Sequence, residues 1–590
     1  MQVLVLWIAI VGQASSSPAV AARPEAALKP AAALKIDERI ATACAAEKVV
    51  PTPVVDDATF LRRAWLDLAG RVPPLTEVQK LSAEKPLDRA ATVDGLLCSR
   101  EFAGYWALLW TEYLTDRRPF DQQGYNGRTL LRSLSTSFAR NQPYNELVAD
   151  LLHGEGDSDV SGPANFLMRY GPEAAPMAGA VGQKFLGLTI QCAECHNHPH
   201  AGWTQTDFWG LAAYFARLRK MNPAEQIEGM DDFSIVVERS RGELLLVDKK
   251  AKPSENGEYP MRTVFPKLPG MTATDMSKSR RSTLVTWATS PENPYFARHA
   301  VNQVWFRLMG AKLVDTLDKL PGSEQGLSVA LLNDLQTAFV DSRFDLRELI
   351  RSIMLSDAYQ RSSVAPMSTP SGDAVAKAPI KYPVTKQAAA LEPGAKKPTG
   401  EKPAGDKAGG EKSTAGKPAV EKAPEKPAPK TAQISAVPAP ADPQLALFAR
   451  ARIRPLSADQ LHLSLGSSLG FYYDENDHRL AVATGEEFTY DVPRQSFSEI
   501  PASLRRSLAL FNSDHVRGAA DVAAESTLRV FGNAAGAEHI ERLFQMLLVR
   551  KPTPEELELL LELAGGDSPK SGLEDVAWVL LNSAEFNTNH

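Results

Sequence analysis

Cysteine is scarce in this sequence: only Cys44, Cys98, Cys192 and Cys195 occur among 590 residues. So few cysteines exclude a small disulfide-rich fold, because such folds compensate for a small core with many bridges. A basic excess is also missing, since 65 Lys and Arg face 71 Asp and Glu. Nucleic-acid-binding proteins usually carry such an excess. The composition therefore predicts a globular protein that is held together by burial and has no nucleic-acid partner.

Long apolar runs are missing beyond the N-terminus. Residues 1–11 are almost all apolar, and Ala19-Val20-Ala21 follows with the spacing of a signal-peptide cleavage site. No Lys or Arg precedes the run, so an uncleaved anchor is the alternative. We predict a signal peptide over residues 1–22 and an exported protein of the periplasm or cell envelope. No later stretch approaches the length of a transmembrane span.

Large apolar side chains are missing from residues 364–441, where Ala, Lys, Pro and Gly dominate and Tyr382 is the one aromatic residue. Such a segment cannot offset the entropy of ordering its backbone, and its prolines favour extended conformations. The sequence therefore predicts a disordered Lys/Pro/Ala-rich insertion here.

The rest of the sequence has mostly helical periodicity. Residues 56–70 have an Asp at the N-cap, apolar residues on one face and Gly70 at the end. Thr76–Gln79 and Ser457–Gln460 have capping-box spacing, and Thr553 precedes a proline suited to the first helical position. We expect further helices near residues 102–114, 145–152, 207–218, 297–308, 346–355, 539–548 and 576–581.

Residues 233–239 and 242–248 have the composition of short strands, and 262–265 is a candidate third. We therefore predict a mainly α, multi-domain helical protein with a small β insert at about 230–268. The expected divisions are the signal peptide (1–22), a helical domain (36–220), a connector with the β insert (221–268), and a second helical domain in two parts (269–363 and 442–590) around the 364–441 insertion.

The most informative motif is Cys192-Ala-Glu-Cys195-His196, which has the C-x-x-C-H spacing of c-type haem attachment. Residues three and four apart share one face of a helical turn. Cys192 and Cys195 are therefore expected to bond one porphyrin while His196 binds its iron. Covalent attachment takes place outside the cytoplasm, in agreement with the predicted export. We predict covalently bound haem c at these three residues.

Other interpretations of the cluster stay open. Cys192 and Cys195 with two of His196, His198 and His200 are four ligands that zinc accepts, although four ligands within nine residues are crowded. On that alternative His198 is a metal ligand. A Cys192–Cys195 disulfide is the simplest alternative and gives the histidines no role. A thioredoxin-like site lacks its βαβ context.

A sixth haem ligand is commonly Met or His. Six candidates occur, none of them marked by its surroundings: Met168, Met177, Met221, Met230, His153 and His299. We therefore name no sixth ligand, and a five-coordinate iron stays open. Aromatic residues follow the motif with helical spacing and are interpreted as core, with a haem wall as the alternative: Trp203, Phe208, Trp209, Tyr214 and Phe215.

Motifs of other chemistries are weak or missing. The sequence has no H-E-x-x-H and no P-loop, and its single G-x-S-x-G lies at Gly466–Gly470. That match follows a predicted helix start at Ser457, so we interpret Gly466 as a helix end and give Ser468 no catalytic role. The carboxylates of Glu155, Asp157 and Asp159 suit calcium, but a solvated loop is the simpler interpretation.

Three stretches, at residues 60–73, 185–199 and 203–215, resemble the planctomycete cytochrome-c-like domain. Residues 293–305, 346–363 and 578–586 are similar to the planctomycete-specific C-terminal domain that accompanies it. The family has no established activity. The resemblance implies haem on Cys192, Cys195 and His196, with His198 matching the second histidine of the family's C-x-x-C-H-x-H-P string. It also implies that the 364–441 segment is an insertion, because the family has a shorter connection there.

These observations predict an exported c-type haem-binding protein that serves electron transfer or an unidentified redox reaction, with an unidentified redox partner protein. The rival is a binding or scaffolding protein of the cell envelope, whose Cys/His cluster is a structural zinc site or a disulfide clip. Whether the protein is an enzyme is left open.

Overall fold

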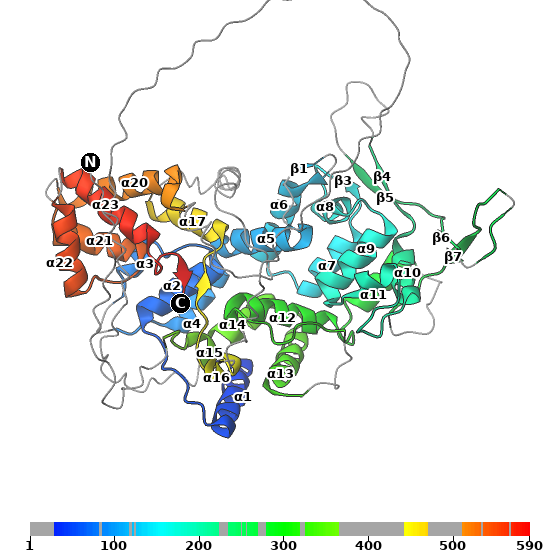
Figure 1. Cartoon of the computed structure of the whole chain (residues 1–590), viewed down its shortest axis with the longest axis horizontal. Coiled ribbons are helices and arrows are strands. Elements are labelled where there is room, and N and C mark those ends of the chain that lie inside the picture. The colour runs from blue at the N-terminus through cyan, green and yellow to red at the C-terminus, as the bar shows by residue number, and fades with distance from the viewer. Residues whose placement is uncertain are drawn as a thin grey trace, which may run out of the picture. The chain divides into compact units, whose positions relative to one another are not determined.

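Helices account for most of the structure, a computed structural model, which confirms the mainly α prediction (Figure 1). It describes residues 29–81, 85–116, 121–122, 125–222, 234–248, 251–254, 256–269, 279–318, 325–364, 442–469, 510–532, 535–565 and 568–590. The predicted signal peptide and the predicted disordered insertion therefore lie outside the described residues. Among the helices within these ranges, none is long and apolar enough to cross a membrane.

The helices of the first half are α1 (Ala31–Glu47), α2 (Asp57–Leu68), α3 (Leu75–Val78), α4 (Arg89–Leu97), α5 (Arg100–Thr115), α6 (Gly127–Ala139), α7 (Tyr144–His153), α8 (Gly162–Arg169), α9 (Ala174–Val181) and α10 (Gln205–Ala212). Those of the second half are α11 (Arg280–Ala288), α12 (Phe296–Met309), α13 (Leu327–Asp341), α14 (Leu346–Met354), α15 (Asp357–Gln360), α16 (Pro443–Ala446), α17 (Ala458–Leu469), α20 (Asp514–Phe531), α21 (Ala537–Leu547), α22 (Pro554–Ala564) and α23 (Pro569–Asn582).

Three helix starts that the sequence predicted from a capping side chain are confirmed. Asp56 accepts a hydrogen bond from Thr59 N at the start of α2. Reciprocal capping bonds join Ser457 to Gln460 and Thr553 to Glu556. The N-cap predicted at Thr76 is wrong, because Pro74 occupies the N-cap position two residues earlier and the helix begins at Leu75.

Strands are short and pair antiparallel. They are β1 (Asp121–Gln122), β2 (Tyr125–Asn126), β3 (Gly156–Asp157), β4 (Leu218–Met221), β5 (Ile235–Glu238), β6 (Leu244–Val247), β7 (Met261–Val264), β8 (Arg454–Pro455) and β9 (Thr588–Asn589). All three strands predicted for the β insert are present. They do not form one sheet, however, because β5 pairs with β3 and β4 while β6 pairs with β7.

Two hydrophobic cores fill the helical structure. The larger one runs from Ile36 in α1 to Ala449 after α16, and the second gathers α17 and α20–α23, drawn from yellow to red in Figure 1. Helix α2 contributes to both, with Phe60 in the first core and Leu66 in the second. Both cores therefore depend on where α2 lies.

The side chain of Asp67, near the end of α2, is fully buried and hydrogen-bonded on both oxygens. Arg454 in β8 donates Nη1 to Oδ1 at 2.9 Å and Nη2 to Oδ2 at 2.7 Å. Asn589 donates to Oδ1 at 3.0 Å, and the Tyr359 hydroxyl donates to Oδ2 at 2.8 Å. A buried charge needs such partners to offset its lost hydration. The carboxylate thereby joins four chain segments.

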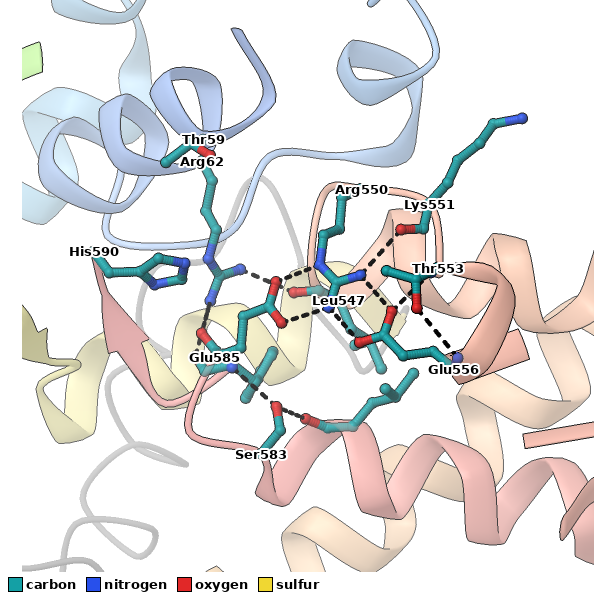
Figure 2. A network of polar contacts seen from close by, with 12 residues as sticks. Thr59, Arg62, Leu547, Arg550, Lys551, Thr553, Glu556, Ser583, Glu585 and His590 are labelled. Carbon is teal, nitrogen blue, oxygen red and sulfur yellow. Dashed lines mark hydrogen bonds and ion pairs between the residues drawn. The ribbon is translucent and has the colours of Figure 1, made fainter. Parts of the chain in front are cut away.

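A second polar network lies where α2 meets the C-terminal helices (Figure 2). The buried Arg62 donates to the carbonyls of Leu547, Glu585 and Phe586, and burial lowers its pKa to about 10. Arg550 holds two carboxylates at once, with bonds of 2.7 to 2.8 Å to Glu556 and 2.7 Å to Glu585. The start of α22 is thus tied to the chain that follows α23.

We expect Asp67→Asn to lower the free energy of unfolding by about 3–5 kcal/mol, because Arg454 keeps its buried charge without a counter-charge. Urea unfolding followed by circular dichroism measures the change. The control is Asp94→Asn, whose ion pair with Arg351 is half exposed and should contribute less than about 1 kcal/mol. Equal effects of the two substitutions would contradict the role given to Asp67.

The Arg550 network predicts an acid-sensitive contribution to stability. Burial alone would raise the pKa of Glu556, but hydrogen bonds from Arg550 and Thr553 and the charge of Arg550 hold that pKa below its ordinary value. The ionised form therefore stabilises the fold above the ordinary carboxyl pKa, and this contribution is lost as the pH falls through the folded pKa. We expect wild type to exceed Glu556→Gln in stability near pH 7, with the gap closing below about pH 4. A gap independent of pH between 3 and 7 would show that the charge of Glu556 contributes nothing.

Candidate functional site

The predicted Cys/His cluster lies in one turn between α9 and α10. The chain passes through a π-helical turn, η1 (Gly182–Leu186), and then a 3-10 helix, η2 (Ile190–Glu194). Cys192 lies in η2, Cys195 directly follows it, and His196 lies in the turn beyond. The expected α-helical turn is therefore replaced by a tighter one. Its three residues per turn still place positions three apart on one side.

Both thiols of the motif are free and exposed. Cys98 is also free and exposed, whereas Cys44 is buried. His196 is exposed as well, beside the two thiols in the sequence. The cluster is therefore accessible from solvent without rearrangement of the core.

The hydrogen bonding of His196 sets its tautomer. Its Nδ1 lies 2.8 Å from the carbonyl oxygen of Asn197. A carbonyl only accepts, so Nδ1 carries a proton, and in the neutral ring the lone pair is on Nε2. No described group forms a hydrogen bond with that Nε2 atom. This is the arrangement that metal-binding histidines commonly have, with one nitrogen oriented by a carbonyl and the other facing the metal.

His198 has both ring nitrogens engaged. Its Nδ1 accepts the backbone N–H groups of His200 at 3.1 Å and Ala201 at 2.8 Å. The ring proton is therefore on Nε2, which lies 3.0 Å from Thr189 Oγ1 and donates to it. These three bonds close the turn between η2 and α10, so binding of a metal by His198 would require one of them to break.

Two side chains of helix α10 donate hydrogen bonds to the backbone of the cluster. Gln205 Nε2 donates to the carbonyls of Glu194 at 3.0 Å and Cys195 at 3.2 Å. Trp209 Nε1 donates to the same Glu194 carbonyl at 3.0 Å. Gln205 and Trp209 are four residues apart and so share a helix face. The Asn197 side chain adds a bond by accepting from Gln205 N.

The start of α10 is itself strongly fixed. Thr204 and Asp207 form a reciprocal capping box, and Lys267 donates to Asp207 Oδ1 at 2.8 Å. Burial alone would raise the pKa of Asp207, but hydrogen bonds from Lys267 and Thr204 hold that pKa below its ordinary value. A negative charge at a helix N-terminus is also favourable. Gln205 and Trp209 are therefore presented from a rigid helix start.

The candidate sixth ligands have other surroundings. Met168 and Met177 are buried in the larger core, Met221 is exposed on β4 and His153 is exposed at the end of α7. Met230 lies outside the described residues. His299 is buried with Nε2 2.8 Å from the Tyr113 hydroxyl, and burial lowers its pKa to about 3. We still name no sixth ligand.

The aromatic residues after the motif are core, as the simpler interpretation predicted. Trp203, Phe208, Tyr214 and Phe215 are buried in the larger core, and the half-buried Trp209 packs against it. Helix α10 ends at Ala212, so the predicted helix over 207–218 is too long. The chain instead continues through the 3-10 helix η3 (Ala213–Phe215) into strand β4.

The weaker motifs show no catalytic or metal-binding arrangement in the described structure. Helix α17 continues through Gly466 to Leu469, so the predicted helix end at Gly466 is wrong, and Gly470 lies outside the described residues. Of the acidic loop, Glu155 pairs with Arg281, Asp157 accepts from Asp159 N, and Asp159 accepts from Asn126. Within the described ranges, no three His, Cys, Asp or Glu side chains are grouped so that they could hold a metal ion.

Sequence reasoning found the cluster but missed the residues that hold it. Gln205 and Trp209 follow the motif on the next helix, and their four-residue spacing is a signal that could have been used. Asn197 lies within the motif's own string and was passed over. Asp318, which contacts this turn from 129 residues away, has no local signal in the sequence.

A helical protein with an exposed Cys-x-x-Cys-His turn is thus the class that the structure defines. Residues 35–220, which include this turn, match the family PSCyt2, described as a protein of unknown function (DUF1549). Residues 280–386 match the family PSD1, described as a protein of unknown function (DUF1553). The two matches follow each other in the order expected for the paired planctomycete-type domains. No match was found among curated proteins or among solved structures.

We expect Gln205→Ala to loosen the turn, because two backbone carbonyls lose a donor. A hydrogen bond contributes about 0.5–1.5 kcal/mol, so amide hydrogen exchange between residues 192 and 198 should speed up about three- to tenfold. Mass spectrometry of peptides after timed exchange measures this. Thr206→Ala, at an exposed position of the same helix, is the control and should leave the rates unchanged. Unchanged rates in Gln205→Ala would show that α10 does not hold the turn.

Proposed function

We propose that the protein is an exported c-type haem-binding protein, with thioether bonds to Cys192 and Cys195 and His196 as axial ligand. One observation carries the proposal: two free, exposed thiols three residues apart lie next to a histidine whose Nδ1 is bonded to a backbone carbonyl. These are the three groups that covalent haem attachment uses.

The surrounding residues suit this task. The Asn197 carbonyl orients the His196 ring through its bond to the Nδ1 proton. Gln205 and Trp209 hold the carbonyls beside Cys195, so the thiol-bearing backbone is fixed before any ligand arrives. When bound, the haem would supply one-electron redox chemistry.

Exposure of the cluster favours electron transfer over chemistry in a closed pocket. Cys192, Cys195 and His196 are all exposed, so a redox partner protein can approach the attachment site directly. The partner would be a component of the periplasm or cell envelope.

The alternative of a structural zinc site requires more ligands than haem attachment does, and the alternative of a disulfide clip requires a bond between Cys192 and Cys195, whose thiols are both free. Zinc in a structural site takes four protein ligands. Recruiting His198 would break either its bond to Thr189 or its bonds to the backbone N–H groups of His200 and Ala201. The pair His196 and His200 would spare these bonds, but within the described ranges no three His, Cys, Asp or Glu side chains are grouped so that they could hold a metal ion. Haem attachment needs only Cys192, Cys195 and His196, and we favour it for that reason.

The proposal predicts a coloured polypeptide. After expression of the full chain with cytochrome c maturation factors, we expect haem to stay with the protein through denaturing electrophoresis, because thioether bonds are covalent. Haem staining and the spectrum of the pyridine complex measure this. The variant with Ser at positions 192 and 195 should be colourless on the gel.

Cys98→Ser is the matched control, because Cys98 is also a free, exposed thiol, and it should retain the haem. His196→Ala should reduce the yield of attached haem or shift its spectrum, whereas His200→Ala should do neither. A colourless wild-type protein containing about one zinc would overturn the proposal and support the clip.

A further inference from the structure

The residues that enter and leave the Cys/His turn both contact a single carboxylate. Asp318 Oδ1 accepts the backbone N–H of Thr189 at 2.8 Å, just before η2, and Trp203 Nε1 at 2.8 Å, just before α10. Asp318 Oδ2 accepts the Thr189 hydroxyl at 2.6 Å. Hydrogen bonds to a charged acceptor are stronger than neutral ones. Asp318 therefore fixes both ends of the turn.

The bonds to Asp318 extend to His198. Because Nδ1 of His198 accepts two backbone N–H groups, its Nε2 proton is donated to Thr189 Oγ1. The Thr189 hydroxyl must then give its own proton to Asp318. The carboxylate of Asp318 thus accepts at the end of a chain of hydrogen bonds whose direction is set by the backbone N–H groups on His198, and it supports the orientation of the His198 ring.

Two further residues of the 280–386 part of the chain, Tyr295 and Leu317, also contact residues next to the turn. The Tyr295 ring meets the Trp203 ring edge to face, with centroids 6.1 Å apart. Leu317 N donates to the Gly187 carbonyl at 3.3 Å. Gly187 has a φ of +66°, and a Cβ there would lie 2.4 Å from His299 Nδ1, so a side chain at this position would be strained and would clash.

We infer that Asp318 is the positioning residue of the Cys/His turn, acting through Thr189 and Trp203. The PSD1 match thereby supplies part of a site whose cysteines and histidines lie in the PSCyt2 match. That Asp318 positions a haem-binding site rests on the proposed function. That Asp318 positions the turn can be measured without haem.

The test uses the full chain without haem and in a Cys98→Ser background, so that the exposed thiols are Cys192 and Cys195. We expect Asp318→Asn to speed their reaction with a disulfide reagent about tenfold, because the charge-assisted bonds that hold the turn are weakened. The Trp203 indole N–H resonance, assigned with Trp203→Phe, should move upfield. Asp315→Asn removes the same charge at an exposed position three residues away and should change neither readout.

An Asp318→Asn protein with the thiol rate and indole resonance of the Asp315→Asn control would overturn the inference. If Asp318→Asn does not fold, Thr189→Val and Trp203→Phe each remove one bond to Asp318, and wild-type thiol rates in both would overturn it equally. Haem attachment is scored separately. If the wild-type protein does not attach haem, the proposed function fails but the thiol rates still test the role of Asp318. If haem attaches normally and the thiol rates of Asp318→Asn are unchanged, only the inference about Asp318 fails.

Discussion

The buried carboxylate of Asp67 is the constraint on which the rest of the structure depends. Hydrogen bonds from Arg454, Tyr359 and Asn589 satisfy it, and these residues lie about 290 to 520 positions away in the sequence. A charge removed from water must be paired or it destabilises the fold. All four segments therefore have to be in place together, and α2 is held between the two hydrophobic cores.

This constraint also explains where the chain can accept a long insertion. Tyr359 and Arg454 lie on either side of residues 365–441, and both reach Asp67. Close to the insertion, Ala451 N donates to the Ser362 carbonyl, and Thr52 bonds the carbonyls of Ser362 and Ala449. The two ends are thus fixed next to each other by the folded part. The entropic cost of closing a loop rises slowly with its length, so a long excursion at this point is tolerated.

The Cys/His turn follows the same principle on a smaller scale. Its reactive groups are local in the sequence, but the bonds that orient them come from α10 and from Asp318. Ile190 and Ala193 anchor the turn in the larger core, while its Cys and His side chains face outward. Polar contacts at its two ends then fix the exposed part. The π-helical turn before it and the positive φ of Gly187 direct the chain out of α9 toward these contacts.

Local patterns predicted those features whose physical causes are themselves local. Side-chain caps at Asp56, Ser457 and Thr553 marked true helix starts, and the composition of residues 233–239 and 242–248 marked true strands. Prediction was wrong where the cause lay elsewhere. Thr76 has the spacing of an N-cap, but Pro74 takes that position two residues earlier. Gly466 is a residue type common at helix ends but lies inside α17. The pairing of the strands could not be predicted from the local sequence, because the partners of β5, strands β3 and β4, lie outside the predicted insert.

The sequence by itself determined the helical class of the fold, the short strands, the order of the two family matches and the cluster of two thiols and three histidines. These follow from periodicity, capping chemistry and a motif within ten residues. Tertiary structure alone decided that Asp67 joins four segments, which nitrogen of His196 and of His198 carries the proton, and that Asp318 holds the turn. Those outcomes depend on hydrogen bonds between residues far apart in the chain, and nothing in a local pattern encodes which distant partner a buried polar group will meet.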